Sequence, residues 1–96
     1  MENRSQDGNA MPEVTFSTFI LSLASSALLH LGEVPNPETG QKQPNLPLAR
    51  HTIDVLEMLR SKTEKGLDAQ ERAMLESILY ELRMKFVMHS EQASTQ

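Results

Sequence analysis

The sequence predicts a small all-α protein of three helices, and three observations support this prediction. Apolar residues recur at helical spacing in three separate segments. A good N-capping residue precedes each segment, and a glycine follows each of the first two. The rest of the chain lacks a convincing alternation of apolar and polar residues, which is typical of strands. We therefore expect three helices, with a long proline-rich loop after the first.

The first predicted helix runs from about Thr15 to Leu31, and it contains most of the uncharged stretch FSTFILSLASSALLHLG at 16–32. Thr15 or Ser17 can cap its first turn, because a side-chain oxygen there accepts a hydrogen bond from a free backbone N–H. Gly32 can end the helix in a left-handed conformation that a Cβ atom disfavours.

This helix has two faces when its residues are placed at about 100° intervals. The apolar face holds Phe16, Ile20, Leu21, Leu23, Ala24, Ala27, Leu28 and Leu31. The opposite face, which we call the Ser/Thr face, holds Thr18, Ser22, Ser25, Ser26 and Leu29. A helix face that meets water normally carries charged residues, whereas small residues let two helices approach closely. We expect the Ser/Thr face to contact a second copy in a homodimer; the alternative is a monomer with a hydrated serine face.

The same stretch raises a membrane alternative, since residues 14–32 have about the minimum length of a membrane span. Its serines, threonines and histidine lower the hydropathy, flanking Lys and Arg are sparse, and Trp and Tyr anchors are missing at both ends. We expect no membrane span here, and membrane association through this helix stays an alternative.

The second predicted helix runs from about Leu46 to Lys65, with Asn45 as its N-cap and Gly66 after its end. Pro47 suits its first turn, where the missing N–H costs nothing. Its predicted apolar stripe consists of Leu48, Thr52, Val55 and Leu59, widened by Ile53 and Leu56.

The third predicted helix runs from about Ala69 to Met88. Asp68 and Glu71 have the spacing of a capping box, and Glu81 and Lys85 that of a surface ion pair. Its predicted core stripe is Leu75, Ile78, Leu79, Leu82 and Phe86, and the apolar residues off this stripe are Tyr80, Met84 and Val87. We interpret Met58, Met74, Met84 and Met88 as core residues or as part of a self-interface. The link to the second helix is so short that the two helices are expected to form an antiparallel hairpin.

The loop EVPNPETGQKQPN at 33–45 is long for a compact helical domain. Its three prolines restrict the backbone and favour an extended, semi-rigid path, with a turn at Pro-Glu-Thr-Gly. Two interpretations are open: a stiff spacer between helices, or a binding loop.

Composition limits the function classes. The 96 residues suffice for one domain, predicted at 14–89, between disordered polar tails at 1–13 and 90–96. A domain of this size is marginally stable alone and gains from a partner. The chain has no cysteine, which excludes disulfides and thiolate metal sites, and no secretory signal pattern. Its net charge of −4 argues against nucleic acid as a partner.

Candidate chemistry is sparse. His30, His51 and His89 fall on different predicted elements, and no pair has the spacing of metal ligands on one helix. His30 and Glu33 can pair and are weak candidates for a ligand site, whereas His51 and Asp54 are interpreted as a surface pair. The sequence therefore assigns no catalytic, cofactor-binding or metal-ligating residue, and predicts a protein that is not an enzyme and uses no cofactor.

Several motifs together resemble a known family. They are F-S-T-F at 16–19, H-L-G-E at 30–33, P-N-P-E-T-G at 35–40, N-L-P-L-A at 45–49 and T-I-D-V-L-E-M-L at 52–59. In this order, from Pro12 to Val87, the sequence resembles the bacterial domain of unknown function 1844. The polar start is shorter than the charged leader associated with many members. The resemblance implies a bacterial, cytoplasmic, non-secreted protein, and it carries over no activity and no site residue.

These observations predict a non-enzymatic helical interaction or assembly module that acts as a homo-oligomer, with an unidentified protein partner also open. The first alternative is a small-ligand or metal-binding protein that uses His30, Glu33 and the loop at 33–45. The second alternative is a membrane-associated protein that uses its first helix.

Overall fold

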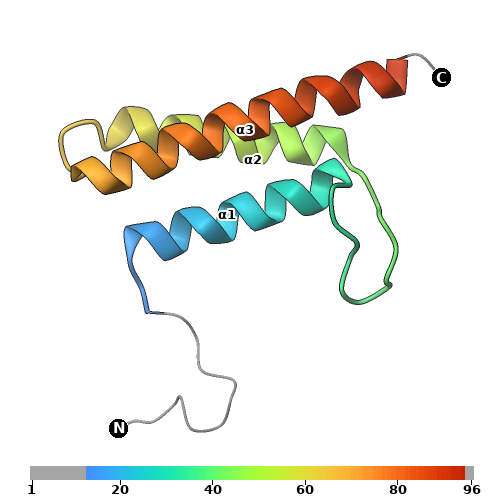
Figure 1. Cartoon of the computed structure of the whole chain (residues 1–96), viewed down its shortest axis with the longest axis horizontal. Coiled ribbons are helices and arrows are strands. Elements are labelled where there is room, and N and C mark those ends of the chain that lie inside the picture. Colours follow the sequence, from blue (N-terminus) through green and yellow to red (C-terminus); the bar gives the residue numbers. More distant parts are fainter. Residues whose placement is uncertain (1–12, 95–96) are drawn as a thin grey trace, which may run out of the picture.

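The computed structural model describes residues 13–94, and within this range the chain is all-α without strands. The helices are α1 (Phe16–Leu31), α2 (Leu46–Lys62) and α3 (Ala69–Ser94). Each helix packs against the other two, and α2 runs antiparallel to both α1 and α3 (Figure 1). The predicted fold class is confirmed, including the antiparallel hairpin of the last two helices and the long loop after the first.

All three helices contribute to one apolar core. Its buried residues are Ile20, Ala27 and Leu31 of α1, Ala49, Ile53 and Leu56 of α2, and Leu75, Leu79 and Leu82 of α3. Thr52 is buried among them, and its hydroxyl donates a hydrogen bond to the Leu48 carbonyl at 3.1 Å, which satisfies the polar group inside the core.

The buried face of α2 differs from the predicted stripe. Leu48 is exposed, whereas Ala49, Ile53 and Leu56 are fully buried. The stripe is therefore rotated toward these three residues, because α2 must face α1 and α3 at the same time. The helix also ends at Lys62 rather than Lys65. Thr63 donates its hydroxyl to the Leu59 carbonyl at 2.7 Å, and this local bond competes with continuation of the helix.

The third helix begins as predicted and ends later. Its capping box is present: the Glu71 N–H donates to the Asp68 carboxylate at 2.7 Å, and the Asp68 N–H donates to the Glu71 carboxylate at 3.0 Å. The helix continues six residues past Met88, to Ser94, into the segment predicted as a C-terminal tail. Apart from Glu13, the predicted N-terminal tail at 1–13 lies outside the described residues, as do residues 95–96.

The residues predicted to lie off the α3 stripe are exposed: Tyr80 at 68%, Val87 at 53% and Met84 at 44%. Met58 and Met88 are also exposed, so the interpretation of these methionines as core residues is wrong for Met58, Met84 and Met88. Their helical positions place them opposite the buried leucines, and residues 13–94 form no fourth helix to cover them.

Gly32 ends α1 with φ +81° and fixes the start of the loop. Its N–H donates to the Leu29 carbonyl and the Glu33 N–H donates to the Leu28 carbonyl, each at 3.0 Å, which is the hydrogen-bond pattern of a Schellman motif. The loop then returns to the helix end, where the Asn45 N–H donates to the His30 carbonyl at 2.7 Å. The loop is thus closed on itself at the end of α1 and holds Glu33 in one place.

Candidate functional site

The outward side of α1 is an exposed surface without formal charge. Ser22, Ser25 and Ser26 are exposed, and their hydroxyls form no hydrogen bond with another group of residues 13–94. Phe19 and Leu21 flank them, each 49% exposed, and Leu29 is half-buried. The structure therefore places most of the Ser/Thr face in solvent, with two large apolar side chains at its edges.

Thr18 has a different role from the serines. The Thr18 N–H donates to the Thr15 hydroxyl at 3.0 Å, and the Thr15 N–H donates to the Thr18 hydroxyl at 3.1 Å, which together form a capping box. The Thr18 hydroxyl in turn donates to the Glu13 carbonyl at 2.6 Å. Thr18 thus defines the start of α1 and lies at the end of the Ser/Thr face.

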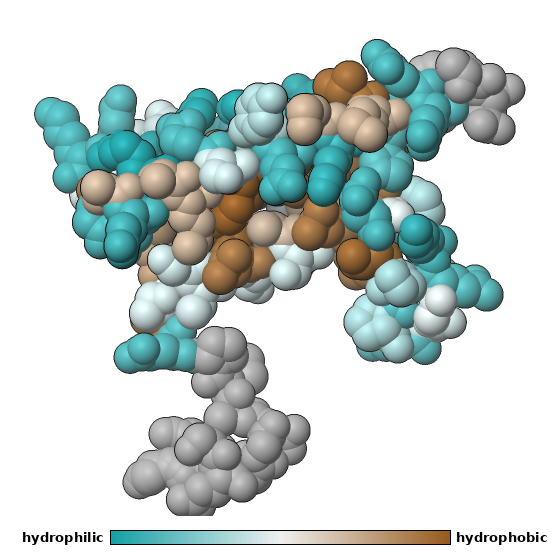
Figure 2. Space-filling view, viewed as in Figure 1, coloured by the Kyte–Doolittle hydropathy of each residue, from teal (hydrophilic) through white to brown (hydrophobic). Residues whose placement is uncertain are grey.

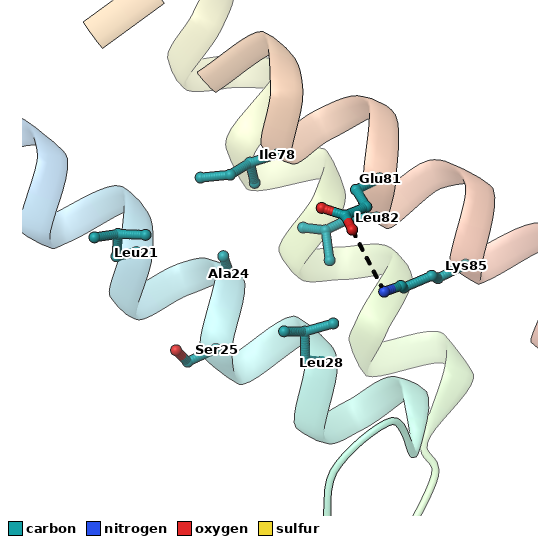
Figure 3. Close-up of a pocket in the computed structure, with 8 residues that line it drawn as sticks. All are labelled: Leu21, Ala24, Ser25, Leu28, Ile78, Glu81, Leu82 and Lys85. Carbon is teal, nitrogen blue, oxygen red and sulfur yellow. Dashed lines mark ion pairs between the residues drawn. The ribbon is translucent and has the colours of Figure 1, made fainter. Parts of the chain in front are cut away.

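An open apolar groove of about 250 Å³ lies beside this face, between α1 and α3 (Figure 3). Its α1 wall consists of Leu21, Ala24, Ser25 and Leu28, and its α3 wall consists of Ile78, Glu81, Leu82 and Lys85. Figure 2 shows hydrophobic atoms along this seam between the two helices. Ser25 belongs to both the groove and the Ser/Thr face, so the two surfaces are continuous. Leu21 was predicted to lie on the apolar face of α1. Its side chain is nevertheless half-exposed, because α3 does not cover it.

Charged residues meet at the end of the bundle where the loop passes α3. His89 Nε2 lies 2.7 Å from Glu33 Oε2, and Lys85 Nζ lies 3.8 Å from Glu33 Oε1. Lys85 also pairs with Glu81 at 3.6 Å, as the sequence predicts. The side chains of Glu33, Lys85 and His89 are each about one quarter exposed. We call these three residues the Glu33 clasp, because they tie the end of α1 to the last turns of α3.

The clasp changes the proton affinity of Glu33. The hydrogen bond with His89 lowers the pKa of the Glu33 carboxyl, partial desolvation opposes this, and the nearby Lys85 ammonium lowers the pKa further. The carboxylate therefore stays ionised under conditions where a free glutamate begins to take up a proton.

The structure changes the predicted partner of Glu33. Within residues 13–94 no hydrogen bond or ion pair joins the His30 side chain to Glu33; His89, 56 positions along the chain, takes that place. His51 does not pair with Asp54 either, which binds Arg50 at 3.2 Å. The pair of Glu33 and His89 does not follow from spacing along one helix, because its residues lie on different elements, whereas Arg50 and Asp54 have the i,i+4 spacing of a helical ion pair. The apolar pattern of the third helix ends before His89. The sequence therefore did not predict that α3 continues past Met88 and brings His89 to Glu33.

The described residues contain neither a cluster of metal ligands nor a helix that could span a membrane. No group of three or more His, Cys, Asp or Glu side chains in residues 13–94 is placed to hold a metal ion. No helix in this range is both long and apolar enough to cross a membrane. The features that stand out are therefore the uncharged outer face of α1 with its groove, and the Glu33 clasp.

Together, the fold and these surfaces define a small three-helix protein in which the exposed face of α1 carries no charged residue. The chain belongs to the family described as Domain of unknown function (DUF1844), which matches residues 13–88. This match confirms the resemblance found in the sequence, and the family has no assigned function. Neither the curated proteins nor the solved structures provide a match to the chain.

Proposed function

We propose that this protein is a non-enzymatic assembly module that works in the bacterial cytoplasm as a homodimer, with the outer face of α1 as its interface. The observation that carries the proposal is the composition of that face: exposed Ser22, Ser25 and Ser26, flanked by half-exposed Phe19 and Leu21. A lack of cysteine suits a reducing compartment.

A two-fold symmetric interface brings the same residues of both copies together near its axis. If this face were charged, like charges of the two copies would meet near the axis. α1 carries no Lys, Arg, Asp or Glu from Phe16 to Leu31. Small side chains also let the helix backbones approach closely, and the free serine hydroxyls can then bond across the contact. The Ser/Thr face therefore suits a second copy of itself better than bulk water.

The test is the solution mass of the wild-type chain and of the double variant Ser22→Lys with Ser25→Lys, measured by light scattering after size exclusion. We expect a dimer for the wild type and a monomer for the variant, because the symmetric contact would bring like charges together. The matched control is Ser61→Lys on the exposed side of α2, which should remain a dimer. A monomeric wild type, or a double variant that dimerises as well as the control, would overturn the proposal.

One observation favours a second candidate, a ligand or metal site. Glu33 and His89, which are both possible metal ligands, meet at 2.7 Å although they lie on different elements. The site would then use Glu33 with His89 in place of His30. Zn²⁺ bound by the native state alone must raise the melting temperature, and Glu33→Gln must abolish that rise. An unchanged melting temperature with Zn²⁺ and other divalent metals would eliminate this candidate.

A further inference from the structure

We infer that the two α1 helices of the dimer cross antiparallel, and that Leu21 of each copy enters the groove between α1 and α3 of the other. This inference rests on the proposed homodimer and adds the orientation of the two copies, together with the side chain that joins them. Its evidence is the size of the Ser/Thr face, the form of the groove and the position of Leu21.

The Ser/Thr face alone is too small for a stable dimer. A helix of 16 residues is about 24 Å long and about 10 Å wide, so its outer face covers about 240 Å² before side-chain relief is counted. Stable dimers bury about 800 Å² on each partner. The interface must therefore extend beyond α1, and the groove is the adjoining apolar surface, since Ser25 belongs to both.

The groove suits a side chain of a second copy. Its volume of about 250 Å³ lies below the range of about 300–1,000 Å³ that is usual for small-molecule pockets. Leu21, Leu28 and Ile78 give it apolar walls, and the only charges on it, Glu81 and Lys85, already pair with each other (Figure 3). An incoming helix without charges, such as α1, leaves no ion unpaired there.

The two-fold symmetry of the dimer determines which side chain of one copy enters the groove of the other. Leu21 and Leu28 are seven positions apart and line the same edge of α1, next to α3. A two-fold axis that lies in the interface, crosses α1 at right angles and passes midway between these two leucines reverses the helix direction but keeps this edge on the same side. Leu21 of the second copy then lies level with Leu28, at the groove. A two-fold axis parallel to α1 would instead carry Leu21 to the opposite edge, away from α3.

The first part of the test measures how much Leu21 contributes to the dimer. Leu21→Ala should raise the dimer dissociation constant in sedimentation experiments by about tenfold or more, because two buried leucines are lost per dimer. The matched control is Met58→Ala, which removes an equally exposed apolar side chain from the outer side of α2 and should leave the constant unchanged. A wild-type dimer with equal constants for both variants would show that Leu21 does not join the two copies, and would overturn the inference while the proposed homodimer stands.

The second part tests the direction of the crossing. The chain has no cysteine, so chains with Leu21→Cys and chains with Glu81→Cys, coexpressed with different tags, can form a mixed disulfide only between copies. We expect this mixed disulfide to form well above the level seen when Ala73→Cys, on the far side of α3, replaces Glu81→Cys. If both cysteine pairs gave the mixed disulfide at the same level while the chains still dimerised like the wild type, the antiparallel crossing would be contradicted and the proposed homodimer would stand. A monomeric wild type would overturn the homodimer and this inference together.

Discussion

Gly32 and Glu33 show how two adjacent residues can join distant parts of the chain. The left-handed conformation of Gly32 ends α1 and turns the backbone so that Glu33 faces α3, where it meets His89 and Lys85. Pro44 packs against Gly32 from the other end of the loop. The position of the Glu33 carboxylate thus depends on a residue that has no side chain of its own.

Gly32→Ala should destabilise the protein by at least about 1–2 kcal/mol, the usual cost of a left-handed conformation for a residue with a Cβ. A Cβ there would also lie 3.0 Å from Pro44 Cγ, which forces the loop to shift. Gly40→Ala is the matched control, because its φ is +71° but no atom lies within 4 Å of the added Cβ. Urea unfolding should show the larger loss for Gly32→Ala, and an equal or smaller loss would contradict this account of the loop.

Glu33 should make stability depend on pH. Because the folded state lowers its pKa, the stabilisation is complete above the unfolded value of about 4.3 and disappears as the pH falls through the folded pKa. Urea unfolding of the wild type and Glu33→Gln should differ at neutral pH, and the difference should shrink as the pH falls below about 4.3. A difference that stays constant down to about pH 3 would show that the carboxylate charge does not stabilise the fold.

At the scale of elements, the capping residues determine where each helix begins. Thr15, Asn45 and Asp68 each accept a hydrogen bond from a backbone N–H of the first turn of α1, α2 and α3. The helix ends follow local rules less closely. α2 stops early at Thr63, and α3 continues through polar residues after Met88.

Asp68→Ala should cost about 1 kcal/mol of unfolding free energy, because it removes an N-cap whose oxygen accepts from the Glu71 N–H at 2.7 Å. The control is Asp54→Ala, which breaks an exposed ion pair with Arg50 and should cost at most about 0.5 kcal/mol. Chemical denaturation of both variants gives the comparison. If Asp68→Ala cost no more than the control, the capping box would not stabilise α3.

The difference between what the sequence predicted and what it missed has a physical basis. Caps, glycines and helical period are local, so the three helices, the end of α1 at Gly32 and the core role of Leu75, Leu79 and Leu82 could be predicted. The contact of Glu33 with His89 depends on how the loop and α3 pack, which no spacing within one helix encodes. The same holds for Leu21, whose exposure depends on how closely α3 approaches α1.

At the scale of the whole molecule, the three helices bury one side of each helix but leave apolar side chains outside. Phe19 and Leu21 remain half-exposed on α1, and Tyr80 and Val87 remain exposed on α3. A chain of 96 residues that exposes this much apolar surface gains stability when a second copy covers part of it. We therefore expect folding and association to be linked.

This linkage predicts a melting temperature that depends on protein concentration. The wild type should melt at a higher temperature as its concentration rises over about a hundredfold range, because mass action favours the folded dimer. The double variant Ser22→Lys with Ser25→Lys should melt at one temperature throughout. Calorimetry or circular dichroism gives the measurement, and a wild type whose melting temperature is independent of concentration would contradict the linkage.

The most direct test of the central claim, that the outer face of α1 binds a second copy, is the solution mass of the wild-type protein without detergent. Light scattering coupled to size exclusion should give twice the 10.8 kDa mass of one chain. A mass of one chain that persists at high protein concentration would contradict the claim, and would leave the Ser/Thr face of α1 open to water.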